Sequence, residues 1–167
     1  MPSSGAVVLV GPMGVGKTTI GKKLAKRLEL TFVDTDQVIS REHGPIPAIF
    51  SEHGEPFFRQ LEEEAVLRFI ATPSVVATGG GAVLSEQTRA ALVQASVVYL
   101  ATDGKHITSR LAGGSRPLLK DGISDWRRIY ESRRNLYEQV ADLTVDTSRV
   151  SLKSIVEEIV SGLGLDD

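Results

Sequence analysis

The sequence predicts an α/β protein of three layers, in which helices cover both faces of one parallel sheet. Short apolar, β-branched runs alternate along the chain with stretches whose apolar residues recur at helical spacing. A glycine-rich run joins the first expected strand to the first expected helix. The 167 residues are enough for one domain with a sizeable core, and the chain contains no internal repeat or interdomain linker.

The expected elements alternate between strand and helix. Five apolar runs are the expected strands, at residues 6–10, 31–33, 75–77, 97–100 and 143–145. Helices are expected from residue 17 onward, as two short pieces at 38–39 and 46–50 around a Gly44-Pro45 break, and at about 55–70, 84–93, 104–111, 125–140 and 151–163. Ligands of such sheets bind beyond the carboxyl ends of the strands, so the residues after each strand are the functional candidates.

The composition excludes several classes of protein. Hydrophobic residues make up 41% of the chain and charged residues 24%, and a net charge of -2 argues against a protein that wraps nucleic acid. The absence of cysteine excludes disulfides and thiolate metal sites. No apolar run approaches the ~20 residues of a membrane span, and no signal-like segment precedes the first strand. We therefore expect a cytoplasmic protein that binds neither nucleic acid nor membrane.

The residues after the first strand match the phosphate-binding pattern G-x-x-x-x-G-K-[ST], in the run Gly11-Pro12-Met13-Gly14-Val15-Gly16-Lys17-Thr18. Glycines let backbone N–H groups approach phosphate oxygens, and the helix start adds unpaired N–H groups. Lys17 can reach the β- and γ-phosphates, and the Thr18 hydroxyl can ligate Mg²⁺. A glycine turn that only caps a helix is the alternative. The expected nucleotide ligands in this loop, called the P-loop below, are Gly14, Val15, Gly16, Lys17, Thr18 and Thr19.

Two carboxylates stand at the end of the second expected strand, in Asp34-Thr35-Asp36. Carboxylates two residues apart at a strand end can point in different directions. Asp34 could complete the Mg²⁺ shell with Thr18, and Asp36 could accept a hydrogen bond, and a proton, from a substrate hydroxyl. The alternative is that either carboxylate only caps the following helix, a role that aspartate favours.

Glycines also mark two later loops. Gly79-Gly80-Gly81 follow the third strand, and three consecutive glycines make sense where a ligand must touch the main chain. A tight strand-to-helix turn is the alternative. Residues 113–122 carry Arg116 and two leucines between glycines, which is what a lid over a phosphoryl group needs; a plain surface loop is the alternative.

Arginines at two places suit recognition of a carboxylate. Arg59 precedes Glu62 by three residues, and a salt bridge between them could hold the guanidinium in place. Arg133 and Arg134 stand before Leu136-Tyr137 on the helix expected at 125–140. Two arginines brought together could clamp a carboxylate with paired hydrogen bonds, whereas a solvated helix face is the alternative for any one of them.

Together these motifs resemble the shikimate kinase family. The matching runs are the P-loop, Asp34-Thr35-Asp36, Phe58-Arg59-Gln60-Leu61-Glu62, the three glycines, Arg116-Pro117-Leu118-Leu119, and Arg133 with Leu136-Tyr137, in the right order over roughly residues 6–147. The resemblance implies a P-loop kinase fold of the nucleoside-monophosphate-kinase type, with strand order 2-3-1-4-5. It implies one kinase domain over residues 1–167, with a substrate-binding segment at about 34–62 and a lid at about 112–123.

The resemblance further implies a reaction and the residues that perform it. A monomer would transfer the γ-phosphate of ATP, with Mg²⁺, to the 3-hydroxyl of shikimate, in the pathway to chorismate and the aromatic amino acids. Lys17, Asp36 and Arg116 would be catalytic, with Asp36 as the candidate base. Arg59 and Arg133 would grip the substrate carboxylate. Further contacts would come from the N–H groups of Gly79, Gly80 and Gly81, from Arg110 and more weakly Arg149 near adenine, and from the apolar walls Phe50, Phe58, Pro117 and Leu118.

Two features depart from the family pattern. His43-Gly44-Pro45-Ile46-Pro47 replaces the usual Gly-x-[Ser/Thr]-Ile, so the next helix loses its polar N-cap and gains two prolines. Arg134 beside Arg133 makes the second carboxylate ligand ambiguous, and the spacing to Leu136-Tyr137 favours Arg133.

Three rival functions use the same P-loop. Another metabolite kinase of this fold, such as gluconate kinase, would not need two arginines and three glycines in these places. A GTPase switch would carry an Asn-Lys-x-Asp guanine signature, which the sequence lacks. A nucleic-acid-acting ATPase is disfavoured by the net charge and the short lid.

Overall fold

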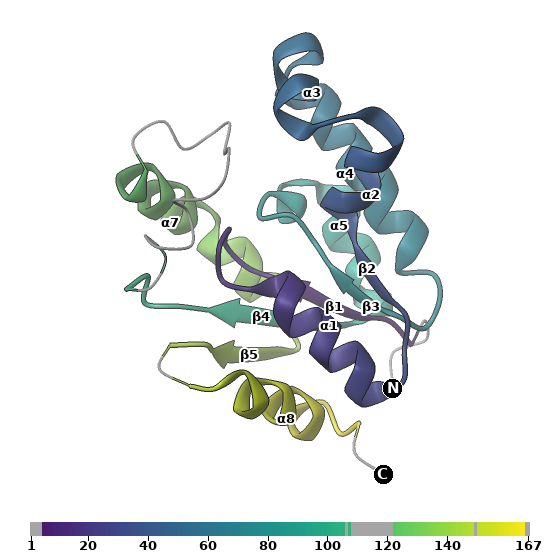
Figure 1. Ribbon diagram of the computed structural model, residues 1–167, viewed down its shortest axis with the longest axis vertical. Coiled ribbons are helices and arrows are strands. Elements are labelled where there is room, and N and C mark those ends of the chain that lie inside the picture. Colours follow the sequence, from purple (N-terminus) through teal and green to yellow (C-terminus); the bar gives the residue numbers. More distant parts are fainter. Residues whose placement is uncertain (1–4, 106, 108–121, 149, 166–167) are drawn as a thin grey trace.

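Five parallel strands form one sheet at the centre of the molecule in the computed structural model, which describes residues 5–105, 107, 122–148 and 150–165 (Figure 1). The strand order β2-β3-β1-β4-β5 confirms the predicted fold class and topology. The strands are β1 (Val7–Val10), β2 (Phe32–Asp34), β3 (Val75–Ala77), β4 (Ser96–Ala101) and β5 (Leu143–Asp146). The helices are α1 (Lys17–Leu28), α2 (Thr35–His43), α3 (Ile46–His53), α4 (Glu55–Phe69), α5 (Glu86–Ala91), α7 (Ile123–Val140) and α8 (Leu152–Gly162), with 3₁₀ turns η1 (Ala82–Leu84) and η2 (Leu92–Gln94).

The central strand β1 lies between β3 and β4 and is buried on both faces. Val8 lies opposite Val76 of β3 and Val97 of β4 in parallel register. Alternate residues of a strand point to opposite faces, so Val8 and its neighbours in the strand contribute to two separate cores. Because β1 and β3 are adjacent, the loops that follow their carboxyl ends are neighbours at one edge of the sheet.

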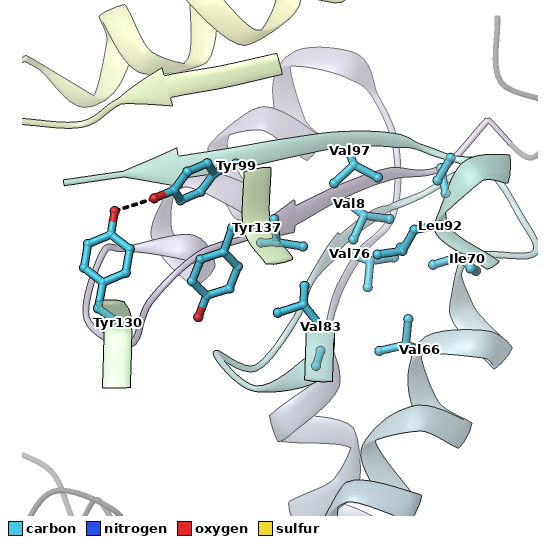
Figure 2. Close-up of a cluster of buried hydrophobic side chains, with 14 of the residues drawn as sticks. Val8, Val66, Ile70, Val76, Val83, Leu92, Val97, Tyr99, Tyr130 and Tyr137 are labelled. Carbon is cyan, nitrogen blue, oxygen red and sulfur yellow. Dashed lines mark hydrogen bonds between the residues drawn. The ribbon is translucent and has the colours of Figure 1, made fainter. Parts of the chain in front are cut away.

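Two hydrophobic cores hold helices against the two faces of the sheet. The first, seen in Figure 2, joins alternate strand residues to α4, η1, η2 and α7; its members include Val8, Val66, Ile70, Val76, Val83, Leu92, Val97, Tyr99, Tyr130 and Tyr137. The second joins the other strand faces to α1 and α8; its members include Leu9, Leu24, Val98, Leu100, Val145, Ile155 and Ile159. This burial on both faces explains why the strands read as continuous apolar runs.

Helices α2, α3 and α4 form a separate group beside the β2 edge of the sheet (Figure 1). Their shared core contains Ile39, Ile49, Phe58, Leu61 and Ala65. Helix α3 begins after Pro45 without a side-chain cap, as the sequence predicted, and the Pro45 carbonyl accepts from the N–H groups of Ala48 and Ile49. The group therefore packs through apolar contacts and holds one face of α4 towards the sheet.

The helix predicted at 84–93 is not continuous, and the helix predicted at 104–111 lies largely outside the described residues. The run expected as one helix at 84–93 is instead η1, a break at Ser85, α5 and η2. The Ser85 hydroxyl accepts from Thr88 N at 3.1 Å, so a serine that favours the N-cap starts a new helix there. In the expected helix 104–111, residues 106 and 108–111 lie outside the described part, as do residues 112–121 of the expected lid.

Candidate active site

The P-loop runs from β1 into α1 and curls around the amino group of Lys17. Gly16 has φ 102°, a left-handed conformation that side chains rarely adopt, and α1 starts there with no side-chain cap. Lys17 Nζ donates to Gly11 O at 2.7 Å and to Pro12 O at 2.9 Å. The helix start and the lysine therefore concentrate hydrogen-bond donors and positive charge in one loop, as an anion site requires.

A cavity of about 210 Å³ opens beside the P-loop and is lined by the ends of three strands. Its lining residues are Met13, Gly14, Gly16, Lys17, Thr18, Thr19, Asp34, Asp36, Thr78, Gly79 and Gly80. The structure thus brings together the three loops that the sequence singled out after β1, β2 and β3. Sequence reasoning missed Thr78, whose hydroxyl donates to Leu9 O at 2.8 Å and ties β3 to β1.

Asp34 caps α2 and also contacts Thr18 of the P-loop. Its Oδ1 accepts from the N–H groups of Asp36 at 3.0 Å and Gln37 at 3.2 Å, which caps α2. Its Oδ2 accepts from the Thr18 hydroxyl at 2.5 Å. One carboxylate therefore starts a helix with one oxygen and faces the P-loop with the other.

In the turn at residues 79–81, called the triple-glycine turn below, Gly79 and Gly81 are glycine for lack of space rather than for conformation. None of these three glycines has a positive φ, so a tight turn does not require them. A Cβ atom placed on Gly79 would lie 2.6 Å from Glu62 Oε2 and 2.9 Å from Asp36 Oδ1. A Cβ on Gly81 would lie 2.1 Å from Arg59 Nη1. The missing side chains therefore make room for charged groups.

Arg59 is held by two glutamates of its own helix. Its Nη1 donates to Glu62 Oε1 at 2.9 Å, which confirms the predicted i, i+3 salt bridge, and its Nε donates to Glu55 Oε2 at 3.2 Å. The guanidinium also lies over the Phe58 ring, 5.2 Å from its centroid. These contacts fix the guanidinium against the backbone of Gly81.

Glu62 is a buried carboxyl group among two arginines and a second carboxylate. Its side chain is only 3% exposed. Burial raises the pKa of Glu62 to about 7, against the lowering effect of Arg59; Asp36 raises this pKa further and Arg133 lowers it. Near neutral pH the carboxyl group is therefore only partly ionised, although it touches a guanidinium.

The structure separates the two adjacent arginines of α7. Arg133 is buried, and its Nη1 lies 3.6 Å from the position of a Cβ on Gly80. Arg134 is exposed, packs over the Tyr130 ring at 5.3 Å and pairs with Glu131 at 3.4 Å. Only Arg133 shares the site with Arg59 and the triple-glycine turn.

Two aromatic contacts to the site were missed by sequence reasoning. The Trp126 indole N–H donates to Met13 O in the P-loop at 2.7 Å, and the Tyr137 hydroxyl donates to Gly80 O at 2.5 Å. Both bonds join residues far apart in the chain, so no local motif reveals them. The available signal is the buried stripe Trp126, Tyr130, Arg133 and Tyr137, spaced four, three and four residues apart.

A second hollow, of about 390 Å³, lies on the other side of the P-loop. It is lined by Gly14, Val15, Gly16, Thr19, Ile20, Thr147, Val150, Leu152 and Ile155. Three of the expected ligands, Arg110, Arg116 and Arg149, lie outside the described residues. Within the described part of the chain, no group of three or more histidine or acidic side chains could hold a metal by itself, and no helix is long and apolar enough to cross a membrane.

The raised pKa of Glu62 predicts a pH-dependent stability. At pH values between 4.5, the ordinary pKa of a glutamate, and about 7, the Glu62 carboxyl group is protonated in the folded chain and ionised in the unfolded chain. Folding then takes up a proton, so the free energy of unfolding should fall as the pH rises through this window. Urea unfolding between pH 5 and 7.5 measures that slope.

Two glutamine substitutions on α4 separate this effect from other titrations. Glu62→Gln should flatten the slope, whereas Glu64→Gln, at an exposed position of the same helix, should keep it. Equal slopes for the wild type and Glu62→Gln would show that Glu62 titrates normally in the folded protein.

Comparisons with known proteins place this site in a family. The profile of the shikimate kinase family matches residues 13–163. A shikimate kinase of Corynebacterium efficiens is 41% identical over 161 residues, covering 94% of this chain and 95% of that protein. A shikimate kinase of Streptomyces coelicolor is 40% identical over 169 residues and covers 99% of both chains.

Solved structures agree with the sequence relatives. Shikimate kinase from Acinetobacter baumannii in complex with shikimate superposes with a TM-score of 0.91 at 35% identity, covering 98% of this chain and 94% of that one. A gluconokinase from Sinorhizobium meliloti reaches a TM-score of 0.60 at 20% identity, which shows a shared fold alone. This chain, which carries the P-loop, Arg59, Arg133 and the triple-glycine turn, therefore belongs to the shikimate kinase family.

Proposed function

We propose that this protein transfers the γ-phosphate of ATP to the 3-hydroxyl of shikimate, giving shikimate 3-phosphate and ADP for the synthesis of chorismate and aromatic amino acids. The observation that carries the proposal is the convergence of the P-loop, Asp36, Arg59 and Arg133 on the triple-glycine turn. This arrangement sets a phosphate site beside a site with two guanidinium groups and a carboxylate. A phosphoryl donor and a small hydroxy acid need such neighbouring sites.

The nucleotide would occupy the two cavities that share the P-loop. The 210 Å³ cavity, with Lys17 and the start of α1, suits the β- and γ-phosphates. The 390 Å³ hollow, lined partly by Val15, Leu152 and Ile155, suits the nucleoside. Contacts from Arg110, Arg116 and Arg149 stay predictions of the sequence.

Thr18 and Asp34 fit the binding of Mg²⁺ together with ATP. A hydroxyl and a carboxylate oxygen lie 2.5 Å apart beside the phosphate cavity. Kinases bind Mg²⁺ through one or two such oxygens, with phosphates and waters completing the shell. Thr18 and Asp34 would therefore hold the ion, which neutralises phosphate charge when it is bound.

Shikimate would bind between α4 and the triple-glycine turn. Arg59 and Arg133 would pair with its carboxylate, and N–H groups of the turn would donate to its oxygens. Asp36 would accept the hydrogen bond of the 3-hydroxyl and take up its proton as the oxygen bonds to the γ-phosphorus and the bond to ADP breaks. A loose transition state needs little early deprotonation, so Asp36 acts chiefly by orienting the hydroxyl. Phe50 and Phe58, 5.0 Å apart, would form an apolar wall.

The first experiment measures ADP release from Mg·ATP with shikimate, with gluconate and with neither acid. The proposal expects release that depends on shikimate. Gluconate tests the rival metabolite kinase of the same fold, because it is also a hydroxy acid with a carboxylate but has an open chain in place of a ring. ADP release with gluconate, or with neither acid, would refute shikimate as the substrate and would leave only the conclusion that the protein is a P-loop kinase with another acceptor.

Substitution of the adjacent arginines tests which one binds the carboxylate. Arg133→Ala should weaken shikimate binding by about 10- to 100-fold, since a hydrogen bond to a charged group contributes roughly 1.5–3 kcal/mol. Arg134→Ala is the matched control, because that side chain is exposed and packs on Tyr130. Calorimetric titration with shikimate measures both. Equal losses in the two variants would refute the assignment of Arg133.

A double-mutant cycle tests why residue 81 is glycine. In Gly81→Ala the new Cβ would displace the guanidinium of Arg59, since the two groups would lie 2.1 Å apart. The KM for shikimate should rise about tenfold while the KM for ATP stays close to that of the wild type. In an Arg59→Ala background the same substitution should add little. A full, additive loss in that background would mean that Gly81 acts independently of Arg59.

A further inference from the structure

One face of α7 contacts both substrate loops. Trp126, Tyr130, Arg133 and Tyr137 are all buried and recur at helical spacing along this face. Trp126, near the start of the helix, donates to the carbonyl of Met13 in the P-loop. Tyr137, near its end, donates to the carbonyl of Gly80 in the triple-glycine turn.

The two loops that α7 holds also lie next to each other. Met13 N and Met13 Cγ each lie 3.4 Å from the position of a Cβ on Gly80, which is ordinary van der Waals distance. The P-loop belongs to the proposed phosphoryl donor site and the triple-glycine turn to the proposed acceptor site. A small shift of one loop against the other would therefore change the distance between the reacting atoms.

A bond to a backbone carbonyl also orients the next N–H group. In a planar trans peptide the C=O of one residue and the N–H of the following residue point in opposite directions. The bond from Trp126 to Met13 O therefore turns the N–H of Gly14 away from α7, and the bond from Tyr137 to Gly80 O does the same for Gly81. Both N–H groups belong to loops that line the site.

The helix is itself packed against the sheet by its aromatic rings. The hydroxyls of Tyr130 and Tyr99 of β4 lie 2.5 Å apart, and the rings of Tyr99 and Tyr137 stack at 5.3 Å (Figure 2). The Trp126 ring packs against Tyr130 at 5.2 Å and against the turn at Gly104, where a Cβ would lie 2.9 Å from it. This ring packing, which does not need the Tyr130 hydroxyl, holds the base from which the two donors extend.

We propose that Trp126 and Tyr137 are positioning residues, which hold the P-loop and the triple-glycine turn at the separation that phosphoryl transfer needs. They act through the carbonyls of Met13 and Gly80, and the Tyr137 hydroxyl also interacts with the guanidinium of Arg133. The inference rests on the proposed placement of ATP at the P-loop and of shikimate at Arg59 and Arg133. Catalysis by positioning is sensitive to such contacts, because a misplacement of about 1 Å can cost about 100-fold in rate.

The test compares three single substitutions on this face of α7. Trp126→Phe and Tyr137→Phe each remove one donor to a substrate loop. Tyr130→Phe is the matched control, because it removes a buried hydroxyl from the same stripe. That hydroxyl bonds to Tyr99 and to the N–H of Thr102 and to neither substrate loop. Steady-state kinetics give kcat and both KM values, and urea unfolding gives the folded fraction at the assay temperature.

The inference expects a loss of kcat without a comparable loss of binding. Trp126→Phe and Tyr137→Phe should lower kcat by about 10- to 100-fold, with the KM for ATP within about threefold of the wild type in both variants and the KM for shikimate within about threefold in Trp126→Phe. Tyr130→Phe should keep kcat within about threefold even where its stability falls equally. The double variant should lose less than the product of the single losses, because both donors set one distance.

Two results would overturn the inference. The first is a kcat that falls in proportion to the loss of stability in all three single variants. The second is a double variant whose loss of kcat equals the product of the two single losses. If Trp126→Phe does not fold, Tyr137→Phe, which loses only one oxygen, decides the question by the same comparison. Failure of the proposed function is distinguishable, because the wild type would then release no ADP in response to shikimate.

Discussion

The site depends on a stretch of backbone that carries no side chains. The triple-glycine turn follows β3, beside β1, and none of its glycines has a positive φ that would exclude a side chain. What requires glycine is the proximity of Glu62 and Asp36 to Gly79, and of Arg59 to Gly81. A Cβ at these positions would occupy the space of the charged groups themselves. The strands bring these groups to one edge of the sheet, and the glycines let them converge there.

The convergence of charge decides which kind of ligand the site favours. Arg59 and Arg133 are fixed cations, Asp36 faces the phosphate cavity, and Glu62 touches Arg59 while its pKa is raised to about 7 by burial. A carboxyl group that is only partly ionised neutralises the two guanidinium groups incompletely. Glu55 also pairs with Arg59, so what favours an anionic substrate over a neutral polyol is the pair of fixed guanidinium donors rather than a surplus of positive charge. Glu62 and Glu55 thus orient Arg59 by hydrogen bonds.

Local patterns predicted the features whose cause is local. The P-loop, the two aspartates after β2 and the Arg59–Glu62 pair depend on spacings of a few residues, and the apolar runs depend on burial on both faces. Ser85 interrupts a helix through its own hydroxyl, and the apolar periodicity concealed that break. The contacts from Trp126 to Met13 and from Tyr137 to Gly80 join residues 113 and 57 positions apart. No sequence spacing encodes such contacts, because tertiary packing decides them.

The strand order explains why one helix reaches both loops. Because β1 lies between β3 and β4, the loops after β1 and β3 are adjacent, and the connection that leaves β4 begins beside them. Helix α7, which lies on this connection before β5, packs on the face shared by these strands. A helix there can present large buried side chains to two loops at once, whereas α1 and α8 cover the opposite face. The topology that places the phosphate and substrate loops side by side therefore also supplies the element that fixes their separation.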